Sequence, residues 1–181
     1  FQYDGNGRFV LAGSEAQNLE MGTNAVIERL EINNGSGVSL EGGTLSLRTE
    51  NLLLTSGTFA HGTDRLQARN DGTGQVTVVS GSLDGSFPSG ATPLRVRYEN
   101  NDDLTAGSEL SAAVNVVEVQ SADDATVTID NGVTVGDRLT LDSGTLASGG
   151  NLTIEDEATI TRGNGQLAGT PTFPSISGGD T

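Results

Sequence analysis

The feature that most constrains the fold is a short apolar period that runs through most of the chain. Pairs of aliphatic residues with one residue between them recur about every seven or eight residues. Neighbouring residues on a strand point to opposite faces, so each pair places two side chains on one face of a short strand. The first half contains Leu30/Ile32, Val38/Leu40, Leu45/Leu47 and Leu52/Leu54, followed by Phe59 and Leu66. The second half contains Val117/Val119, Val127/Ile129, Val133/Val135, Leu139/Leu141, Leu146, Leu152/Ile154, Ile160 and Leu167.

These strands span about three to five residues, and Gly, Asn, Asp, Ser and Thr fill the stretches between them, as in NNGSG at 33–37 and DSGT at 142–145. Such residues favour tight corners, because Gly adopts positive φ and short polar side chains bond to nearby backbone. Antiparallel hairpins usually have longer strands. Three short faces make a coil of roughly 20 residues, so we predict an all-β fold, a parallel β-solenoid (β-helix) with aliphatic residues inside. A β-sandwich of repeats is the alternative.

The chain also repeats itself at a longer spacing. The sequence AGSE occurs at 12–15 and again at 106–109, and each copy follows one of the two tyrosines, Tyr3 and Tyr98. Internal repetition of this kind indicates tandem units. The predicted units are 1–92 and 93–181.

One stretch departs from the short period. Ser14 and Gln17 have the spacing of a capping box, and Gly22 is a suitable helix end. We therefore predict two helical turns over residues 15–21.

The composition excludes several classes of partner. Nine Arg and no Lys oppose 24 acidic residues, which gives a net charge of −15. A protein this acidic repels phosphate backbones, so we expect no nucleic-acid partner. No apolar run approaches the roughly 20 residues of a membrane span, so we expect no membrane insertion. The chain opens FQYDGNGRFV, without an initiator Met or an apolar leader, and we interpret it as a processed product or part of something longer.

Few residues could carry catalysis. His61 is the single His and the chain has no Cys, so a zinc site lacks its ligands. We expect His61 to be an exposed or corner residue. The adjacent acids of Asp102/Asp103, Asp123/Asp124 and residues 155–157 would face opposite sides of a strand, so we interpret them as solvated corners rather than paired catalytic carboxylates. We assign no catalytic residue, cofactor site or metal site, and predict that the protein is not an enzyme.

Two ligand classes stay open. The segments YDGNGR at 3–8 and NDGTGQ at 70–75 offer oxygen ligands for calcium, but neither completes a known calcium loop. Tyr3 and Tyr98 could stack on a glycan, or pack over the end of a coil with their hydroxyls in water. A calcium-dependent adhesion module and a carbohydrate-binding or carbohydrate-cleaving β-helix are therefore the alternative functions.

The order of Tyr, G-S-E, VxxLxIxNxxGVxL and LxLxSGxL resembles the repeats of large secreted surface and adhesin-like proteins of Bacteroidota and related bacteria. The matching stretches are Val26 to Leu40 with Leu52 to Phe59, and Val114 to Ile129 with Leu139 to Leu146. The resemblance implies a β-rich stalk or adhesin segment, displayed outside the cell, with no catalytic residues to carry over.

Taken with the period, this resemblance leads us to expect a non-enzymatic extracellular structural module. A solenoid exposes unpaired N–H and C=O groups at an uncapped end. We therefore expect its partners to be flanking repeats of a longer chain or copies of itself, and surface glycans are a further candidate. A head-to-tail contact that does not close would generate a filament.

Overall fold

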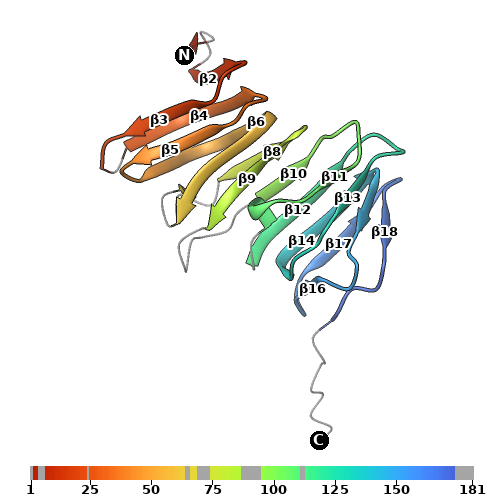
Figure 1. Cartoon of the computed structure of the whole chain (residues 1–181). Coiled ribbons are helices and arrows are strands. Elements are labelled where there is room, and N and C mark those ends of the chain that lie inside the picture. Colours follow the sequence, from red (N-terminus) through yellow and green to blue (C-terminus); the bar gives the residue numbers. More distant parts are fainter. Residues whose placement is uncertain are drawn as a thin grey trace, which may run out of the picture.

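A computed structural model of the chain describes residues 2–3, 7–23, 25–63, 66–68, 74–86, 95–110 and 113–173, without the side chains of residues 2–3, 45–51 and 67–68. The described regular structure is almost entirely strand. Figure 1 shows the strands following one another along an elongated molecule, from the N-terminal to the C-terminal end.

The longest sheet extends from one end of the molecule to the other (Figure 1). All its pairs are parallel except the first, in which β1 runs antiparallel to β2. Its strands in spatial order are β1 (Gln2–Tyr3), β2 (Arg8–Gly13), β4 (Ala25–Asn34), β6 (Leu45–Thr63), β8 (Gln75–Val78), β10 (Arg95–Tyr98), β12 (Ala113–Gln120), β14 (Val133–Ser143) and β16 (Leu152–Ile154). Beside this path, β7 (Leu66–Ala68) pairs with β6 and β17 (Thr159–Arg162) pairs with β14.

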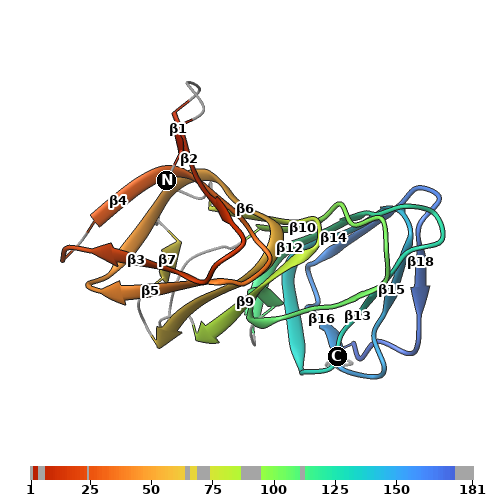
Figure 2. The same cartoon turned by 45° about the horizontal axis from the view of Figure 1, so that its top comes forward.

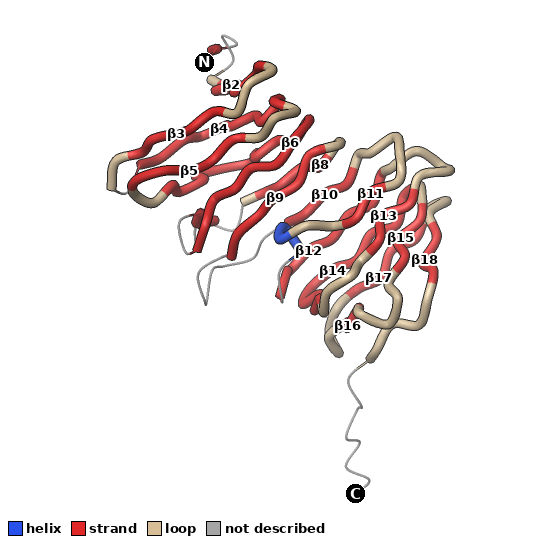
Figure 3. Tube along the Cα trace, viewed as in Figure 1, coloured by secondary structure: helices blue, strands red, loops and turns tan. Residues whose placement is uncertain are grey.

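A second face of the coils is made of two separate groups of parallel strands. The first group is β3 (Gln17–Met21), β5 (Val38–Gly42), part of β6, and β9 (Gly81–Ser86). The second group is β11 (Leu104–Thr105), β13 (Thr126–Thr128), β15 (Thr145–Ala147) and β18 (Gln166–Ala168). Between the groups lies a short 3-10 helix, η1 (Ser108–Leu110), which is the blue segment in Figure 3.

The register of the long sheet shows that the chain winds in successive coils. Each coil places one residue beside its counterpart in the next, in the column Phe9, Leu30, Leu52, Val76, Val96, Val117, Leu139 and Ile160. The steps are 20 to 24 residues, so one coil takes about 21 residues and the described chain makes about six turns. The predicted parallel β-solenoid is confirmed, and Figure 2 shows the winding from a second direction.

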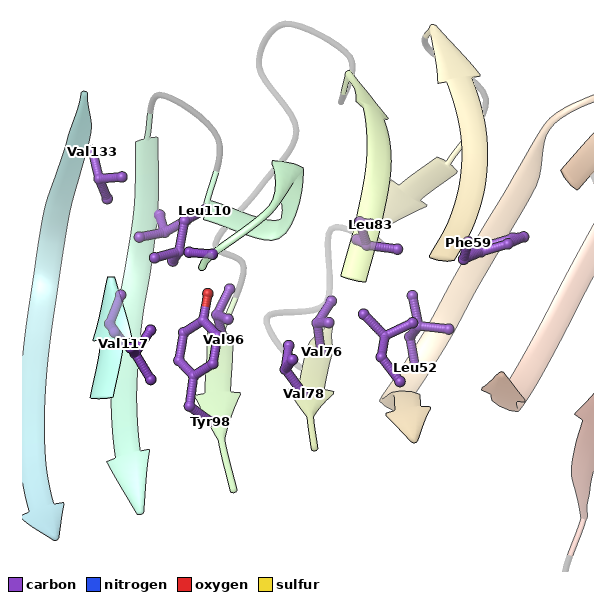
Figure 4. Close-up of a cluster of buried hydrophobic side chains, with 14 of the residues drawn as sticks. Leu52, Phe59, Val76, Val78, Leu83, Val96, Tyr98, Leu110, Val117 and Val133 are labelled. Atoms are coloured by element: carbon purple, nitrogen blue, oxygen red, sulfur yellow. The ribbon is translucent and has the colours of Figure 1, made fainter. Parts of the chain in front are cut away.

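The interior of the coils is filled by the predicted apolar pairs. The second residue of each pair forms its own column, which runs Leu11, Ile32, Leu54, Val78, Tyr98, Val119 and Leu141. All seven are buried. Pairs outside these two columns, such as Val127/Ile129 and Val133/Val135, are buried too (Figure 4 shows part of this core). Like side chains therefore stack on like side chains along the axis, which explains how a chain so poor in aromatics builds a continuous core.

Several strands are longer than the three to five residues predicted from the pairs. The strand β6 covers 19 residues and takes part in more than one face of its coil. The register shifts between Ile27 and Arg29, where β6 has two extra residues, and between Val114 and Val116, where β14 has one. These extra residues turn the corner without ending the ladder. Such bulges bend a strand while preserving most of its pairing.

Glycines occupy corners where the next coil passes close by. Gly144, in DSGT, has φ +76°, and a Cβ there would lie 2.8 Å from Ser121 Cβ and 3.0 Å from the carbonyl oxygen of Ala122. This corner requires both the positive φ and the missing side chain. The predicted role of DSGT as a corner is thereby confirmed.

The predicted helix over residues 15–21 is wrong, because residues 17–21 form β3. Leu19 pairs with Leu40 in the adjacent coil and is buried. Helix propensity is a weak preference that tertiary packing overrides. Here the strand buries the Leu19 side chain, and its main-chain groups form hydrogen bonds with the parallel strand β5. Two isolated helical turns would do neither.

The predicted boundary near residue 92 lies in residues 87–94, outside the described residues. On either side of it, β8 and β10 pair in register from Gln75↔Arg95 to Val78↔Tyr98. The two predicted units thus share one sheet, and their division at 1–92 and 93–181 stays a prediction.

Candidate functional site

Among the described residues, the stacking of the second face is interrupted between β9 and β11, where this face changes from one group of strands to the other. The described pairs of β9 are with β6, and those of β11 are with β13. The helix η1 packs in the gap, and Glu109 from η1 is fully buried there. A buried charge-bearing side chain needs hydrogen-bond partners, so its contacts identify what closes this gap.

The Glu109 carboxyl group accepts three hydrogen bonds. Oε1 accepts from the Tyr98 hydroxyl at 3.0 Å and from the Gly107 N–H at 2.7 Å. Oε2 accepts from the Leu83 N–H at 3.2 Å, which lies on β9. The side chain thus satisfies a main-chain donor at a strand edge, in the place where a neighbouring strand would otherwise pair. We call these residues, Leu83, Tyr98, Gly107 and Glu109, the seam.

The position of Gly107 explains why AGSE is needed here. A Cβ at residue 107 would lie 2.7 Å from the Leu83 carbonyl oxygen and 2.8 Å from Glu109 Oε2. The equivalent acid of the first AGSE, Glu15, is exposed at a corner. The AGSE sequence therefore forms part of the buried seam at 106–109 and an exposed corner at 12–15.

Tyr98 is wrongly predicted as a glycan-stacking residue. Its side chain has 0% exposure, so neither ring face is accessible to a sugar. Figure 4 shows the ring among Val96 and Val117, with its oxygen directed toward Leu110. The hydroxyl is bonded to Glu109 rather than to water. Burial, followed by the charge of Glu109 and the hydrogen bond to it, holds the pKa of Tyr98 well above its usual value of 10. The side chain of Tyr3 lies outside the described residues.

His61 is also placed differently from the prediction, since it is fully buried within β6. Its ring lies 6.3 Å from that of Phe59, measured between centroids. A Cβ added to Gly85 in the next coil would lie 2.8 Å from the ring, so the imidazole fills the space that this glycine leaves. Burial lowers the pKa of His61, and the charge of Asp84 opposes that change.

The acidic pairs lie where they were predicted. Asp102, Asp103, Asp123, Asp124 and residues 155–157 are exposed in turns between strands. Asp103 Oδ1 accepts a hydrogen bond from the Thr126 N–H at 2.8 Å, which ties one corner to the next coil. Their interpretation as solvated corners is confirmed.

No group of three or more His, Cys, Asp or Glu side chains within the described part of the chain is arranged to hold a metal ion. Of the two segments considered for calcium, residues 4–6 and 70–73 lie outside the described residues. Nor do the described residues include a helix long and apolar enough to cross a membrane.

Sequence reasoning missed a cluster of charges on the outer surface of the long sheet. Glu118 on β12 is almost buried beneath three guanidinium groups. The distances from its carboxylate are 2.8 Å to Nη2 of Arg97, 3.4 Å to Nη2 of Arg138 and 3.7 Å to Nε of Arg95. We call Arg95, Arg97, Arg138 and Glu118 the arginine cluster.

The arginine cluster follows directly from the coil repeat. Arg97 pairs with Glu118 across β10 and β12, and these positions are 21 residues apart in the sequence. The column beside it contains Arg95, Val116 and Arg138. The signal that could have found the cluster is the spacing of oppositely charged residues by one coil length. Burial works to lower the pKa of Arg97, but the hydrogen bond to Glu118 and the charges of Glu118 and Glu99 outweigh it, so the pKa is raised.

The two ends of the coil stack differ. At the N-terminal end, β1 covers part of β2 through the antiparallel pairs Gln2↔Val10 and Tyr3↔Phe9. At the C-terminal end, Ile160 stands in an interior column yet is 44% exposed, and Phe173 is 57% exposed. The last coil therefore exposes Ile160, whereas its column counterparts from Leu30 to Leu139 are buried.

Comparison of this chain with protein-family models, with curated proteins and with solved structures finds no match in any of the three.

Proposed function

We propose that this chain is a non-enzymatic structural module of an extracellular or cell-surface protein, in which stacked coils hold two attachment points apart and associate end to end. The observation that carries the proposal is the parallel ladder of the long sheet, which continues from β2 to β14 and on to β16 and β17. A stack of this kind resists bending because each coil shares main-chain hydrogen bonds and side-chain contacts with both neighbours.

The surface chemistry is consistent with a spacer. The net charge of −15 keeps molecules apart laterally, and the acidic corners are exposed along the stack. The buried polar groups of the seam are engaged in structural hydrogen bonds. These features favour a mechanical role over a catalytic one.

The apolar end supports association with a further coil. Another coil stacked on β17 and β18 would cover Ile160 and Phe173. It would do so in the way that Ile160 covers Leu139 of the preceding coil. A coil in that place would also pair with the outer edges of these strands. At the N-terminal end, β1 covers part of the edge of β2. It would have to detach before β2 could pair with the last coil of another molecule.

The experiment combines electron microscopy with sedimentation velocity over rising protein concentration. The proposal predicts narrow elongated particles that join end to end as concentration rises. Ile160→Asp should shift assembly to much higher concentration. Thr105→Asp is the matched control, because Thr105 is exposed on β11, away from both ends of the stack, and this variant should assemble like the parent. Compact particles would contradict the spacer role, and elongated particles that never associate would contradict end-to-end association alone.

A further inference from the structure

The outer surface of the long sheet carries an unusual share of the positive charge. Five of the six arginine side chains that the structure describes are at outward positions of this sheet: Arg8, Arg29, Arg95, Arg97 and Arg138. The molecule as a whole has a net charge of −15. Most of the described positive charge of an acidic protein therefore lies on one face, where Glu31, Glu99 and Glu118 neutralise part of it. Guanidinium groups that are not fully neutralised attract anions at short range.

The charges of the arginine cluster are incompletely balanced. Three guanidinium groups share Glu118, and Glu99 approaches Arg97 at 3.6 Å as the second carboxylate. The Nε of Arg138 is buried and has no hydrogen-bond partner among the described residues. Arg95 and Arg138 keep about two fifths of their side chains exposed, at 41% and 38%. Cationic donors thus remain available on the surface after Glu118 is satisfied.

Neutral hydrogen-bonding groups surround these arginines. Gln75 and Thr77 lie on the strand before, and Thr140, Thr159 and Thr161 lie on the strands after. Gln75 donates to the Thr77 hydroxyl at 2.9 Å, so its amide is already positioned on this face. Arg95 and Arg138 are two strands apart, about 10 Å along the axis. Thr77 is buried, so the surface presents the separated cations beside the half-buried Gln75 and Thr140 and the exposed Thr159 and Thr161.

From this arrangement we infer that the arginine cluster and the neighbouring Thr and Gln side chains bind a linear acidic polysaccharide, carboxylated or sulfated, lying along the coil axis. Guanidinium groups bind planar oxyanions through paired N–H donors. Sugar hydroxyls match the Thr and Gln groups between the charges. An extended polymer also suits an open sheet surface, where it can contact several coils at once.

Two other polyanions fit this surface less well. A nucleic acid brings a phosphate at every nucleotide, and the acidic corners on either side would repel that dense charge. A second copy of this chain brings its own net charge of −15, so lateral contact would oppose two acidic surfaces. A polysaccharide with neutral hydroxyl-bearing groups between its charges avoids both penalties. This inference does not depend on the spacer role.

The experiment measures binding of the whole chain to polygalacturonate, heparin, neutral dextran and a single-stranded oligonucleotide at low and physiological salt. Binding to polygalacturonate or heparin is expected, weakening as salt rises, with little binding to dextran or the oligonucleotide. The double variant Arg95→Gln/Arg138→Gln should bind roughly tenfold or more weakly. Arg162→Gln is the matched control, because Arg162 is exposed on the last coil outside the cluster. Polygalacturonate carries carboxylates alone, so binding to it shows that sulfate is not required, whereas binding to heparin alone shows that sulfate is required.

A second variant guards against loss of folding in the double variant. Thr159 and Thr161 are exposed, and Thr159→Glu/Thr161→Glu adds negative charge beside the cluster without removing an ion pair. It should abolish binding while circular dichroism stays unchanged. Absence of binding at low salt, equal loss with Arg162→Gln, or binding that survives the two glutamates would overturn the inference. Preference for the oligonucleotide, or lateral dimers that the arginine substitutions dissociate, would also overturn it.

Discussion

The hydroxyl of Tyr98 donates a hydrogen bond of 3.0 Å to Oε1 of Glu109, and both side chains are completely buried. In the described coils, β9 and β11 belong to separate sheets and do not pair with each other. The Tyr98–Glu109 pair fills the gap between them. Its role is structural: it lets the long sheet continue while the second face changes from one group of strands to another.

Glu109→Gln should destabilise the protein by about 1–3 kcal/mol, because an amide cannot accept all three hydrogen bonds that the carboxyl group accepts. Chemical denaturation measures the change in the free energy of unfolding. Glu15→Gln is the matched control from the exposed copy of AGSE, and it should change stability by no more than about 0.5 kcal/mol. Equal effects at the two positions would contradict the seam.

Stability should fall as pH rises above 10. Tyr98 keeps its proton in the folded state because its pKa is raised, whereas the unfolded state loses it near pH 10, so alkali favours unfolding. The chain has no Lys or Cys, which leaves the tyrosines to dominate titration in this range. Denaturation between pH 8 and 11.5 measures the loss, and Tyr98→Phe should flatten it. A variant profile as steep as that of the parent would contradict the burial of Tyr98.

Stability should also fall in mild acid because of His61. Its folded pKa is lowered, so the unfolded state takes up the proton first as pH falls below 6.5. The stabilisation is complete above 6.5, and its loss on acidification is at most about 1.4 kcal/mol per pH unit. Denaturation from pH 7.5 to 5 measures this slope, and His61→Leu should reduce it. An unchanged slope in the variant would mean that His61 titrates normally.

Much of the interior could be predicted from the sequence, because the parallel ladder places the same inward-facing pattern of apolar residues in every coil. Pairs such as Leu52/Leu54 and Leu139/Leu141 were predicted to face inward, and they do so in consecutive coils. The seam could not be predicted in this way. The seam depends on which strand edge has no neighbouring strand, and this is a property of the folded coils. In the sequence alone, Glu109 stands in the same AGSE motif as the exposed Glu15, so nothing distinguishes the two. His61 was placed outside because its burial relies on Gly85, a full coil away.

Gly144→Ala should destabilise the protein by about 1–3 kcal/mol, since the added methyl group would meet Ser121 and Ala122 and the residue must keep φ +76°. Thermal and chemical denaturation both report the change. Gly132→Ala is the control, because a Cβ there meets nothing within 4 Å and its φ is not positive. A tolerated substitution at Gly144 would show that successive coils are less closely stacked at this corner.

The most direct test of the account measures distances between spin labels along one outward column of the long sheet. The chain has no Cys, so pairs of cysteines can be introduced among Val10, Leu53, Thr140 and Thr161, and no native thiol will take up the label. The register places Leu53 and Thr161 five strands apart, Val10 and Thr140 six, and Val10 and Thr161 seven. A parallel solenoid predicts separations of about 24, 29 and 34 Å, which increase by one strand spacing at each step. Distances that do not increase with the number of coils, as in a sandwich of antiparallel strands, would contradict the fold and the structural role built on it.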